Sequence, residues 1–294
     1  MWTNHLNRKL ARGEVAVSMI VRMSRGPEVG AIAQAAGFDS LYVDLEHSPL
    51  GLETVSVLCH SAQAAGVTPL VRVPAIEGGL ITRVLDAGAM GIVAPHVASA
   101  ADCAEVVACC KFTPLGSRST SSTLPQVGYA GAVARIGSQA DVNAAVNRET
   151  TVVVMIESAA GVAQVKEIAT TDGVDILLVG AGDLSADLGC AGRLDDPRLM
   201  ESIGRVIEAC ADSGKVAGIG GMAARPDLMA QLVAKGARYL SLGTDTGFMV
   251  AGGAAAFRKA RDAARPEVNP AAATPPDPTR VPPARRPPGN PGTP

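Results

Sequence analysis

The sequence predicts an α/β fold, a (β/α)8 barrel of the TIM type, from three observations. Eight short apolar runs rich in β-branched residues alternate along the chain with segments of helical character. Several of those segments stop at a glycine, as helices often do. Aromatic residues make up only 3% of the chain, so aliphatic side chains must fill the core, as they do around parallel strands covered on both faces. This order gives right-handed parallel crossovers, and a doubly wound open sheet is the alternative.

Each expected strand is an apolar run, and four of the expected helices between strands precede a glycine. The strands are Val15–Val21, Ser40–Glu46, Thr68–Val73, Gly91–Pro95, Thr151–Glu157, Asp175–Val179, Lys215–Ile219 and Arg238–Leu242. The helices that end before Gly37, Gly66, Gly88 and Gly236 are Glu28–Ala36, Glu53–Ala65, Leu80–Ala87 and Asp227–Lys235.

One connection is much longer than the others. Between the fourth and fifth strands lie an expected helix at Ala98–Cys110, the Ser-, Gly- and Thr-rich segment Phe112–Gly131 and a short helix near Gln139–Arg148. Long connections in compact domains are usually functional, so this one is expected to serve the site.

A change of composition divides the chain into a barrel body, residues 1–265, and a tail, residues 266–294. The tail holds more than half of the chain's 20 prolines and has no apolar periodicity. We expect it to be extended, disordered and inert, and a Pro-rich ligand for another protein is the alternative.

Composition excludes several classes of protein. Hydrophobic residues make up 47% of the chain and charged residues 18%, with a mean hydropathy of +0.22, which favours a large buried core. The net charge of −2 gives no basic surface for nucleic acid or anionic lipid. No apolar run reaches the roughly 18 residues of a membrane span. The polar amino terminus and six cysteines without a Cys-x-x-Cys pair predict a cytoplasmic protein with reduced thiols.

Reactive side chains gather where barrel chemistry takes place, at the carboxyl ends of the expected strands. These side chains are Asp44, Glu46, His47, Arg72, Glu157, Asp183 and Asp245. His47 lies near two acids and is interpreted as a base, with a structural histidine as the alternative. His60 and His96 lack such neighbours and are interpreted as structural. Asp245 is expected to cap the helix that follows it.

The acids predict a metal site. None of the chain's lysines ends an expected strand, which disfavours a Schiff-base mechanism. Glu157 and Asp183 would instead give Mg²⁺, Mn²⁺ or Co²⁺ two oxygen ligands and leave the other positions to water and a chelating 2-oxo acid. Arg72 would stabilise an enolate, and His47 would take the proton of a 4-hydroxyl group as the C3–C4 bond breaks.

The same residues lie in motifs with a specific order and spacing. From about Gly13 to Ala264 the motifs include GFDSLYVDLEHSP, PLVRVP, ITRVLDAGAMGIVAPHV, VVMIES and GVDILLVGAGDLSADLG. In these motifs the chain resembles the class II, metal-dependent pyruvate aldolases of the 2,4-dihydroxyhept-2-ene-1,7-dioate aldolase family, within the citrate lyase-like superfamily.

The resemblance implies a role for each matching position. Glu157 and Asp183 look like the metal ligands, His47 like the base and Arg72 like the enolate-stabilising arginine. It further implies that Asp86 raises the basicity of that histidine, that Asp44 lies near it, and that the backbone of Gly182 contacts the substrate carboxylate. Members are homohexamers, trimers of dimers that exchange C-terminal helices, and Thr246–Ala264 would be that helix.

Two departures concern the substrate. Met155 stands where relatives that cleave a dicarboxylic substrate have a glutamine in contact with it. In the long loop Arg118 is followed by Ser119, where family members commonly have glycine. The aldehyde is therefore the least defined part of the reaction.

The sequence thus predicts an aldehyde-lyase that reversibly cleaves a 4-hydroxy-2-oxo acid to pyruvate and an aldehyde. One alternative is an acyl-CoA lyase of the malyl-CoA type, although Phe112–Gly131 offers only Arg118 to the phosphates of CoA. The other is a pyruvate-binding barrel without catalytic activity, against which both acids and His47 argue.

Overall fold

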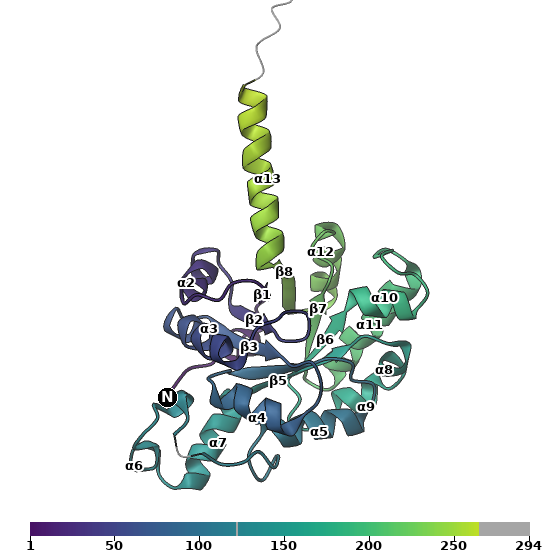
Figure 1. The fold of residues 1–294 in the computed structure, drawn as a ribbon. Helices are drawn as coiled ribbons and strands as arrows, with labels where there is room; N and C mark the ends of the chain where they lie inside the picture. Colours follow the sequence, from purple (N-terminus) through teal and green to yellow (C-terminus); the bar gives the residue numbers. More distant parts are fainter. Residues whose placement is uncertain (122, 265–294) are drawn as a thin grey trace, which may run out of the picture. The chain divides into compact units, whose positions relative to one another are not determined.

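A computed structural model describes residues 1–121 and 123–264, and within them eight parallel strands form a closed barrel in chain order (Figure 1). The predicted fold class is confirmed, and the open sheet is excluded. All eight expected strands are present, as β1 Ala16–Val21, β2 Ser40–Asp44, β3 Thr68–Arg72, β4 Gly91–Ala94, β5 Thr151–Ile156, β6 Ile176–Gly180, β7 Val216–Gly220 and β8 Tyr239–Thr244.

Thirteen α-helices lie within the described residues. They are α1 His5–Ala11, α2 Glu28–Ala35, α3 Leu52–Ala64, α4 Gly78–Asp86, α5 Ala100–Cys110, α6 Ala132–Ile136, α7 Gln139–Glu149, α8 Ala159–Ala163, α9 Val165–Ala169, α10 Ala181–Asp187, α11 Pro197–Asp212, α12 Pro226–Lys235 and α13 Asp245–Ala263, with a 3₁₀ turn at Pro125–Val127. The glycines expected to stop α2, α3, α4 and α12 have φ of 86°, 76°, 112° and 123°, a region that costs glycine little.

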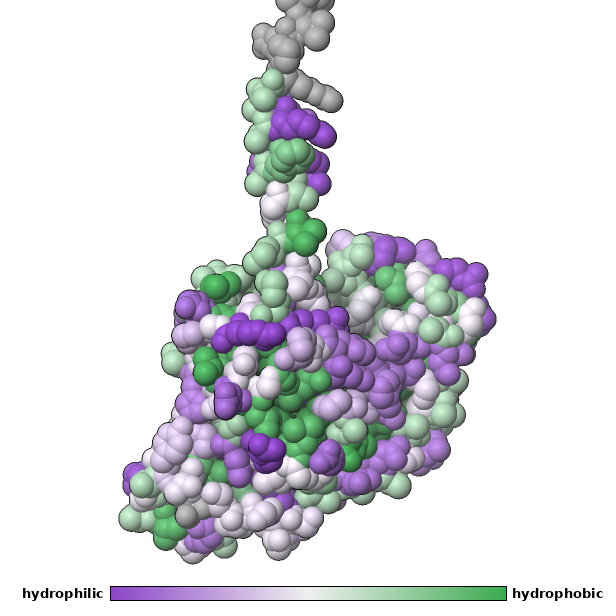
Figure 2. Space-filling view, viewed as in Figure 1, coloured by the Kyte–Doolittle hydropathy of each residue, from purple (hydrophilic) through white to green (hydrophobic). Residues whose placement is uncertain are grey.

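The core has two layers that differ in composition. Aliphatic side chains fill the space between the strands and the surrounding helices. The barrel interior holds a smaller set that includes Tyr42, Leu70 and Tyr239, joined by Leu6 and Leu10 of α1. On the face shown in Figure 2, hydrophobic side chains gather in the middle of the barrel unit, and hydrophilic side chains surround them.

The long connection between β4 and β5 folds on a core of its own. Phe112, Leu124, Val127 and Val146 are buried together, and the ring of Phe112 lies 4.6 Å from the guanidinium carbon of Arg118. The expected helices in this connection correspond to α5 and α7.

Residues Met1–Val250 form one compact unit, and the described residues 251–264, which include the remainder of α13, belong to a second. The proline-rich tail, residues 266–294, lies outside the described residues, so its predicted disorder stays a prediction. Among the described helices, none combines the length and the apolar character that a membrane span requires.

Candidate active site

Asp44 is the centre of an ion-paired cluster at the carboxyl ends of β2 and β3. The two strands pair with Asp44 opposite Arg72, so the register itself brings the two side chains together. Arg72 donates from Nε to Asp44 Oδ1 at 2.9 Å and from Nη2 to Oδ2 at 2.6 Å, and Arg22 Nε donates to Oδ2 at 2.6 Å. Burial alone would raise the pKa of the Asp44 carboxyl, but the hydrogen bonds and charges of these guanidiniums hold it below its ordinary value.

The same carboxylate shapes the loop that carries His47. The backbone N–H groups of Glu46 and His47 donate to Asp44 Oδ1 at 3.1 and 3.2 Å. The His47 side chain is 53% exposed and lies at the rim of the cavity described below. Glu46 turns inward, with Oε2 2.7 Å from Arg72 Nη1.

Arg72 is held rigidly below this rim. Its guanidinium carbon lies 5.4 Å from the ring centroid of Tyr42, and all three of its nitrogens lie against Asp44 or Glu46. Burial lowers the pKa of Arg72, but its bonds to Asp44 and the surrounding negative charge raise it overall, so the side chain is a permanent cation.

Glu157 and Asp183 form the carboxylate pair of the site. Glu157 directly follows β5, and Asp183 lies in the first turn of α10, which directly follows β6. Burial raises the pKa of Glu157 above its ordinary value, and the nearby charges of Asp183 and Glu46 raise it further, against a backbone hydrogen bond from His96. Two carboxylates that repel each other in a partly buried place are a donor set suited to a hard divalent cation.

The donor set at this place is limited to those two carboxylates. Within the described part of the chain there is no cluster of three or more His, Cys, Asp or Glu side chains able to hold a metal ion. The pair therefore fits an ion whose remaining positions are taken by water and substrate, as predicted from the sequence.

A cavity of about 180 Å³ opens between these side chains. The sequence-predicted residues that line it are His47, Arg72, Met155, Glu157, Gly182 and Asp183. Asp44 lies behind Arg72 and Arg22. The structure thus brings together most of the residues that the sequence singled out.

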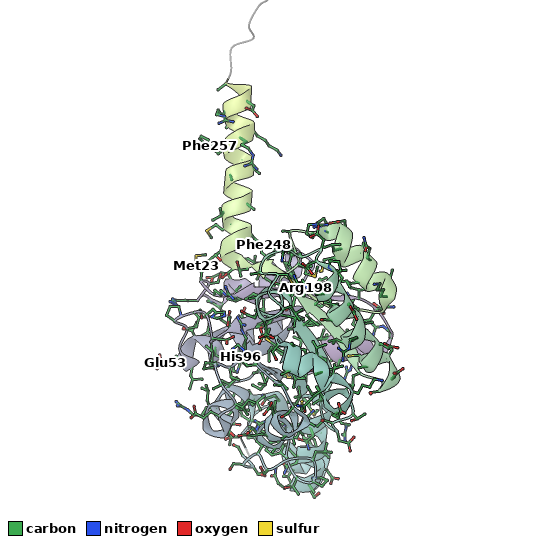
Figure 3. The ribbon with its side chains drawn as sticks, turned by 90° about the vertical axis from the view of Figure 1, so that its right-hand side faces the viewer. Met23, Glu53, His96, Arg198, Phe248 and Phe257 are labelled. Carbon is green, nitrogen blue, oxygen red and sulfur yellow. The ribbon has the colours of Figure 1, made fainter. Side chains whose placement is uncertain are left out.

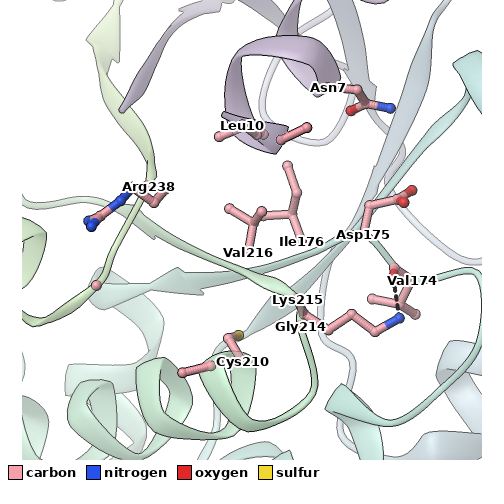
Figure 4. A pocket seen from close by; sticks show the side chains of 13 residues that line it. Asn7, Leu10, Val174, Asp175, Ile176, Cys210, Gly214, Lys215, Val216 and Arg238 are labelled. Carbon is pink, nitrogen blue, oxygen red and sulfur yellow. Dashed lines mark hydrogen bonds between the residues drawn. The ribbon is translucent and has the colours of Figure 1, made fainter. Parts of the chain in front are cut away.

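A larger cavity of about 570 Å³ lies at the other end of the barrel, at the amino ends of β6, β7 and β8. Figure 4 shows Asp175, Lys215 and Arg238 around it, with Lys215 Nζ 2.8 Å from the carbonyl oxygen of Val174. It contains none of the predicted site residues, and chemistry in barrels belongs to the opposite face.

Asp86 is the predicted residue that the structure does not bring to His47. It ends α4, where its carboxylate accepts a hydrogen bond from Arg118 Nη2 at 2.6 Å. Within residues 1–121 and 123–264, no hydrogen bond or ion pair joins Asp86 to His47.

His96 lies in the site, and the prediction that it is structural is wrong. Its backbone N–H donates to Glu157 Oε2 at 2.9 Å, and its ring nitrogens lie 2.9 Å from Glu46 Oε1 and 3.3 Å from Glu157 Oε2. Its φ of 58° is uncommon for a residue with a side chain, and its side chain is 64% exposed. Figure 3 labels His96 among the side chains of the barrel unit. The sequence signal that could have placed His96 in the site was its position just after β4, at the carboxyl end of a strand.

Buried acids, a fixed arginine and a rim histidine at the carboxyl ends of a closed parallel barrel define a barrel enzyme. The chain belongs to the HpcH/HpaI aldolase/citrate lyase family, whose model matches residues 18–251. Aldolases of this family are metal-dependent lyases, in agreement with the carboxylate pair. The resemblance stated above is thereby confirmed.

Relatives and a solved structure extend this finding. The chain is 42% identical to 4-hydroxy-4-methyl-2-oxoglutarate aldolase cghB of Chaetomium globosum over 221 residues, 74% of this chain and 80% of that protein. It is 40% identical to 4-hydroxy-4-methyl-2-oxoglutarate aldolase tasA of Hapsidospora irregularis over 222 residues, 75% of this chain and 81% of that protein. The crystal structure of an HpcH/HpaI aldolase from Desulfitobacterium hafniense superposes on this chain with a TM-score of 0.79 at 29% identity. The superposition covers 92% of this chain and 100% of that chain.

Proposed function

We propose that the enzyme reversibly cleaves a 4-hydroxy-2-oxo acid to pyruvate and an aldehyde or other small carbonyl compound. The observation that carries the proposal is the single cavity that unites Arg72, His47 and the pair Glu157 and Asp183. The aldolase names of the two fungal relatives support the same reaction type.

Glu157 and Asp183 are proposed to hold a divalent ion, Mg²⁺, Mn²⁺ or Co²⁺. Such an ion, when bound, acts as a Lewis acid that polarises the 2-oxo group and balances the charge of the enolate. The carboxylates keep the ion at the carboxyl ends of β5 and β6. The backbone N–H of Gly182 is proposed to receive the substrate carboxylate, because Gly182 lines the cavity and no atom outside its own helix lies within 4 Å of the place where a Cβ would be.

Arg72 is proposed to donate to the 2-oxo oxygen and stabilise the developing enolate. Asp44 and Glu46 hold its planar fork before the substrate arrives, so little reorganisation accompanies the reaction. Asp44 is therefore a positioning residue.

His47 is proposed to take the proton of the 4-hydroxyl group, directly or through a water molecule. The C4–O bond then becomes a carbonyl, the C3–C4 bond breaks, and its electron pair forms the pyruvate enolate. A proton delivered to C3 completes pyruvate. Asp86 remains proposed as the acid that raises the basicity of His47, on the family resemblance alone.

The competing acyl-CoA reaction has less support. The phosphates of CoA would need accessible cations in the loop between α5 and α7. Arg118 in that loop is buried and paired with Asp86. Assays with free 4-hydroxy-2-oxo acids against CoA thioesters separate the two reactions.

Deuterium exchange at the pyruvate methyl group tests the proposal. The enzyme with Mn²⁺ or Mg²⁺ should exchange these protons in D₂O and add pyruvate to a short acceptor, and exhaustive EDTA treatment should stop both reactions. Exchange that survives EDTA would remove the metal from the mechanism, and no exchange with any ion would favour a binding protein without catalytic activity.

The enzyme is further proposed to act as a homo-oligomer, a hexamer built as a trimer of dimers. Met249 and Val250, in the first part of α13, are 64% and 71% exposed. Adjacent apolar side chains with such large exposed fractions are typical of a surface that another chain covers.

A further inference from the structure

Arg22 is a cation of the cavity that the proposed mechanism leaves without a task. It directly follows β1 and lines the cavity two residues beyond Ile20, as expected for alternate positions of one strand facing the barrel interior. Its side chain is 33% exposed, so its charge is within reach of a ligand from solvent.

The backbone around Arg22 is fixed in place. The carboxylate of Asp245 accepts hydrogen bonds from the N–H groups of Arg22, Met23 and Ser24 at 3.1, 3.1 and 2.7 Å. These bonds hold the pKa of Asp245 below its ordinary value even though burial opposes them. Asp245 therefore ties the loop after β1 to the start of α13, so the backbone from which Arg22 projects is held in place. The prediction that Asp245 caps α13 is wrong, because the hydroxyl of Thr244 accepts the hydrogen bond from the N–H of Gly247 at 3.0 Å.

Only one nitrogen of Arg22 is occupied. Its Nε donates to Asp44 Oδ2, and no described residue accepts a hydrogen bond from Nη1 or Nη2. Arg72, in contrast, has each of its three nitrogens against Asp44 or Glu46. Arg22 is therefore the guanidinium in the cavity lining with a complete two-nitrogen fork left to offer.

The rest of the cavity narrows the choice of ligand. Ile20, Tyr42, Met155 and Leu178 give it largely apolar walls, and its volume of about 180 Å³ suits only a few heavy atoms beyond pyruvate. A planar carboxylate is the group that a guanidinium fork binds in two parallel hydrogen bonds.

We infer that Arg22 binds the carboxylate of the acceptor, so that the acceptor is a short 2-oxo acid and not a neutral aldehyde. The inference rests on the proposed function and names the substrate class of that same site. The cleaved substrate then carries carboxylates at both ends, and Arg22 fixes the end that leaves.

Two acceptors of nearly equal size test the assignment, glyoxylate with a carboxylate and glycolaldehyde with a hydroxymethyl group. The measurement is kcat/KM for their addition to pyruvate, with Mn²⁺ present. In Arg22→Gln the ratio of glyoxylate to glycolaldehyde activity should fall about 10- to 100-fold, the usual effect of removing a hydrogen bond to a charged group. In Arg22→Lys, which keeps the charge but loses the two-nitrogen fork, this ratio should fall less.

Arg25→Gln is the matched control, because it removes the same charge from the same loop outside the cavity lining, and its ratio should stay within twofold. An equal loss for both acceptors in Arg22→Gln would mean that Arg22 only positions Asp44, and an unchanged ratio would exclude acceptor binding. Either result overturns the assignment while pyruvate exchange by the native enzyme still supports the aldolase. If the native enzyme neither exchanges nor forms product with any acceptor, the proposed function fails, and the assignment falls with it.

Discussion

Asp44 at the end of β2 has four partners, because two guanidiniums and two backbone N–H groups depend on its charge. Asp44→Asn should destabilise the fold by about 3–5 kcal/mol at pH 7, since the buried guanidinium of Arg72 then keeps only Glu46 as a counter-charge and the half-buried guanidinium of Arg22 loses its partner. The pKa of the Asp44 carboxyl is lower in the folded protein than in the unfolded chain. Its contribution to the free energy of unfolding is therefore complete above the ordinary aspartate pKa of about 3.9, and it is lost as the pH falls through the lowered pKa of the folded protein.

Urea denaturation at pH 7 and below pH 4 measures this difference. The gap between the native protein and Asp44→Asn should narrow at the lower pH. Asp212→Asn, at an exposed position of α11, should follow the native protein at both. A gap that stays constant with pH would mean that shape, not charge, makes Asp44 important.

His47 and Asp183 should separate chemistry from metal binding. His47→Ala should keep the affinity for Mn²⁺ and slow cleavage by roughly 10²–10⁴-fold, the usual size of general acid–base assistance. Asp183→Ala should lose Mn²⁺ affinity and turnover together, because it removes one of two carboxylates. Titration calorimetry and steady-state rates on both variants provide the measurement, and equal loss of metal in both would place His47 among the ligands.

Single residues were predictable where a strand end dictates the position. Glu157, Asp183 and Arg72 follow from the rule that barrel sites lie at the carboxyl ends of strands. Arg22 and His96 occupy equivalent positions, but their roles depend on which neighbours reach them, and the sequence does not contain those distances. Asp86 needed the family resemblance, and its observed partner Arg118 comes from a loop without regular structure.

At the scale of elements, the end of β6 shows how a strand shapes the site. A Cβ on Gly180 would lie 2.6 Å from Glu157 Oε1 and 2.8 Å from Glu157 Cγ, so a side chain there must displace that carboxylate. Gly180→Ala should therefore raise the dissociation constant for Mn²⁺ about 10- to 100-fold, the usual effect of disturbing the support of a ligand.

Gly204→Ala in α11 is the control, because no atom lies within 4 Å of its would-be Cβ. It should leave Mn²⁺ affinity unchanged and stabilise the helix by about 0.5–1 kcal/mol. Calorimetric titration with Mn²⁺ compares the two variants, and unchanged affinity in Gly180→Ala would show that Glu157 tolerates displacement or does not bind the ion.

The elements themselves were largely readable from the sequence. Apolar β-branched runs predicted every strand to within a few residues, because a strand that is covered on both faces is apolar along its whole length. Glycine stops gave the ends of α2, α3, α4 and α12. The division of the segment after β5 into the short helices α8 and α9 was not predicted. Each of these helices has only five residues, which is too short to show a helical periodicity in the sequence.

At the scale of the whole molecule, closure of the barrel is what turns scattered residues into a site. Glu157 and Asp44 lie far apart in the sequence and on non-adjacent strands, yet both end at the same face. Closure also leaves the sheet without free edges, so association between chains must use other surfaces. The sequence predicts the barrel, but assembly depends on partners outside a single chain.

Assembly is expected to depend on α13 and not on the tail. The proposed hexamer should sediment at six times the 29.8 kDa mass of the chain. A chain that ends at Ala264 keeps all of α13 and should still sediment at six times its own, smaller mass, whereas a chain that ends at Val250 loses most of the helix and should dissociate into smaller species. Sedimentation equilibrium distinguishes them, with circular dichroism to check that the barrel is folded. A hexamer that survives loss of residues 251–294 would place the subunit contacts on the barrel itself, and dissociation of the Ala264 chain would make the tail part of the interface.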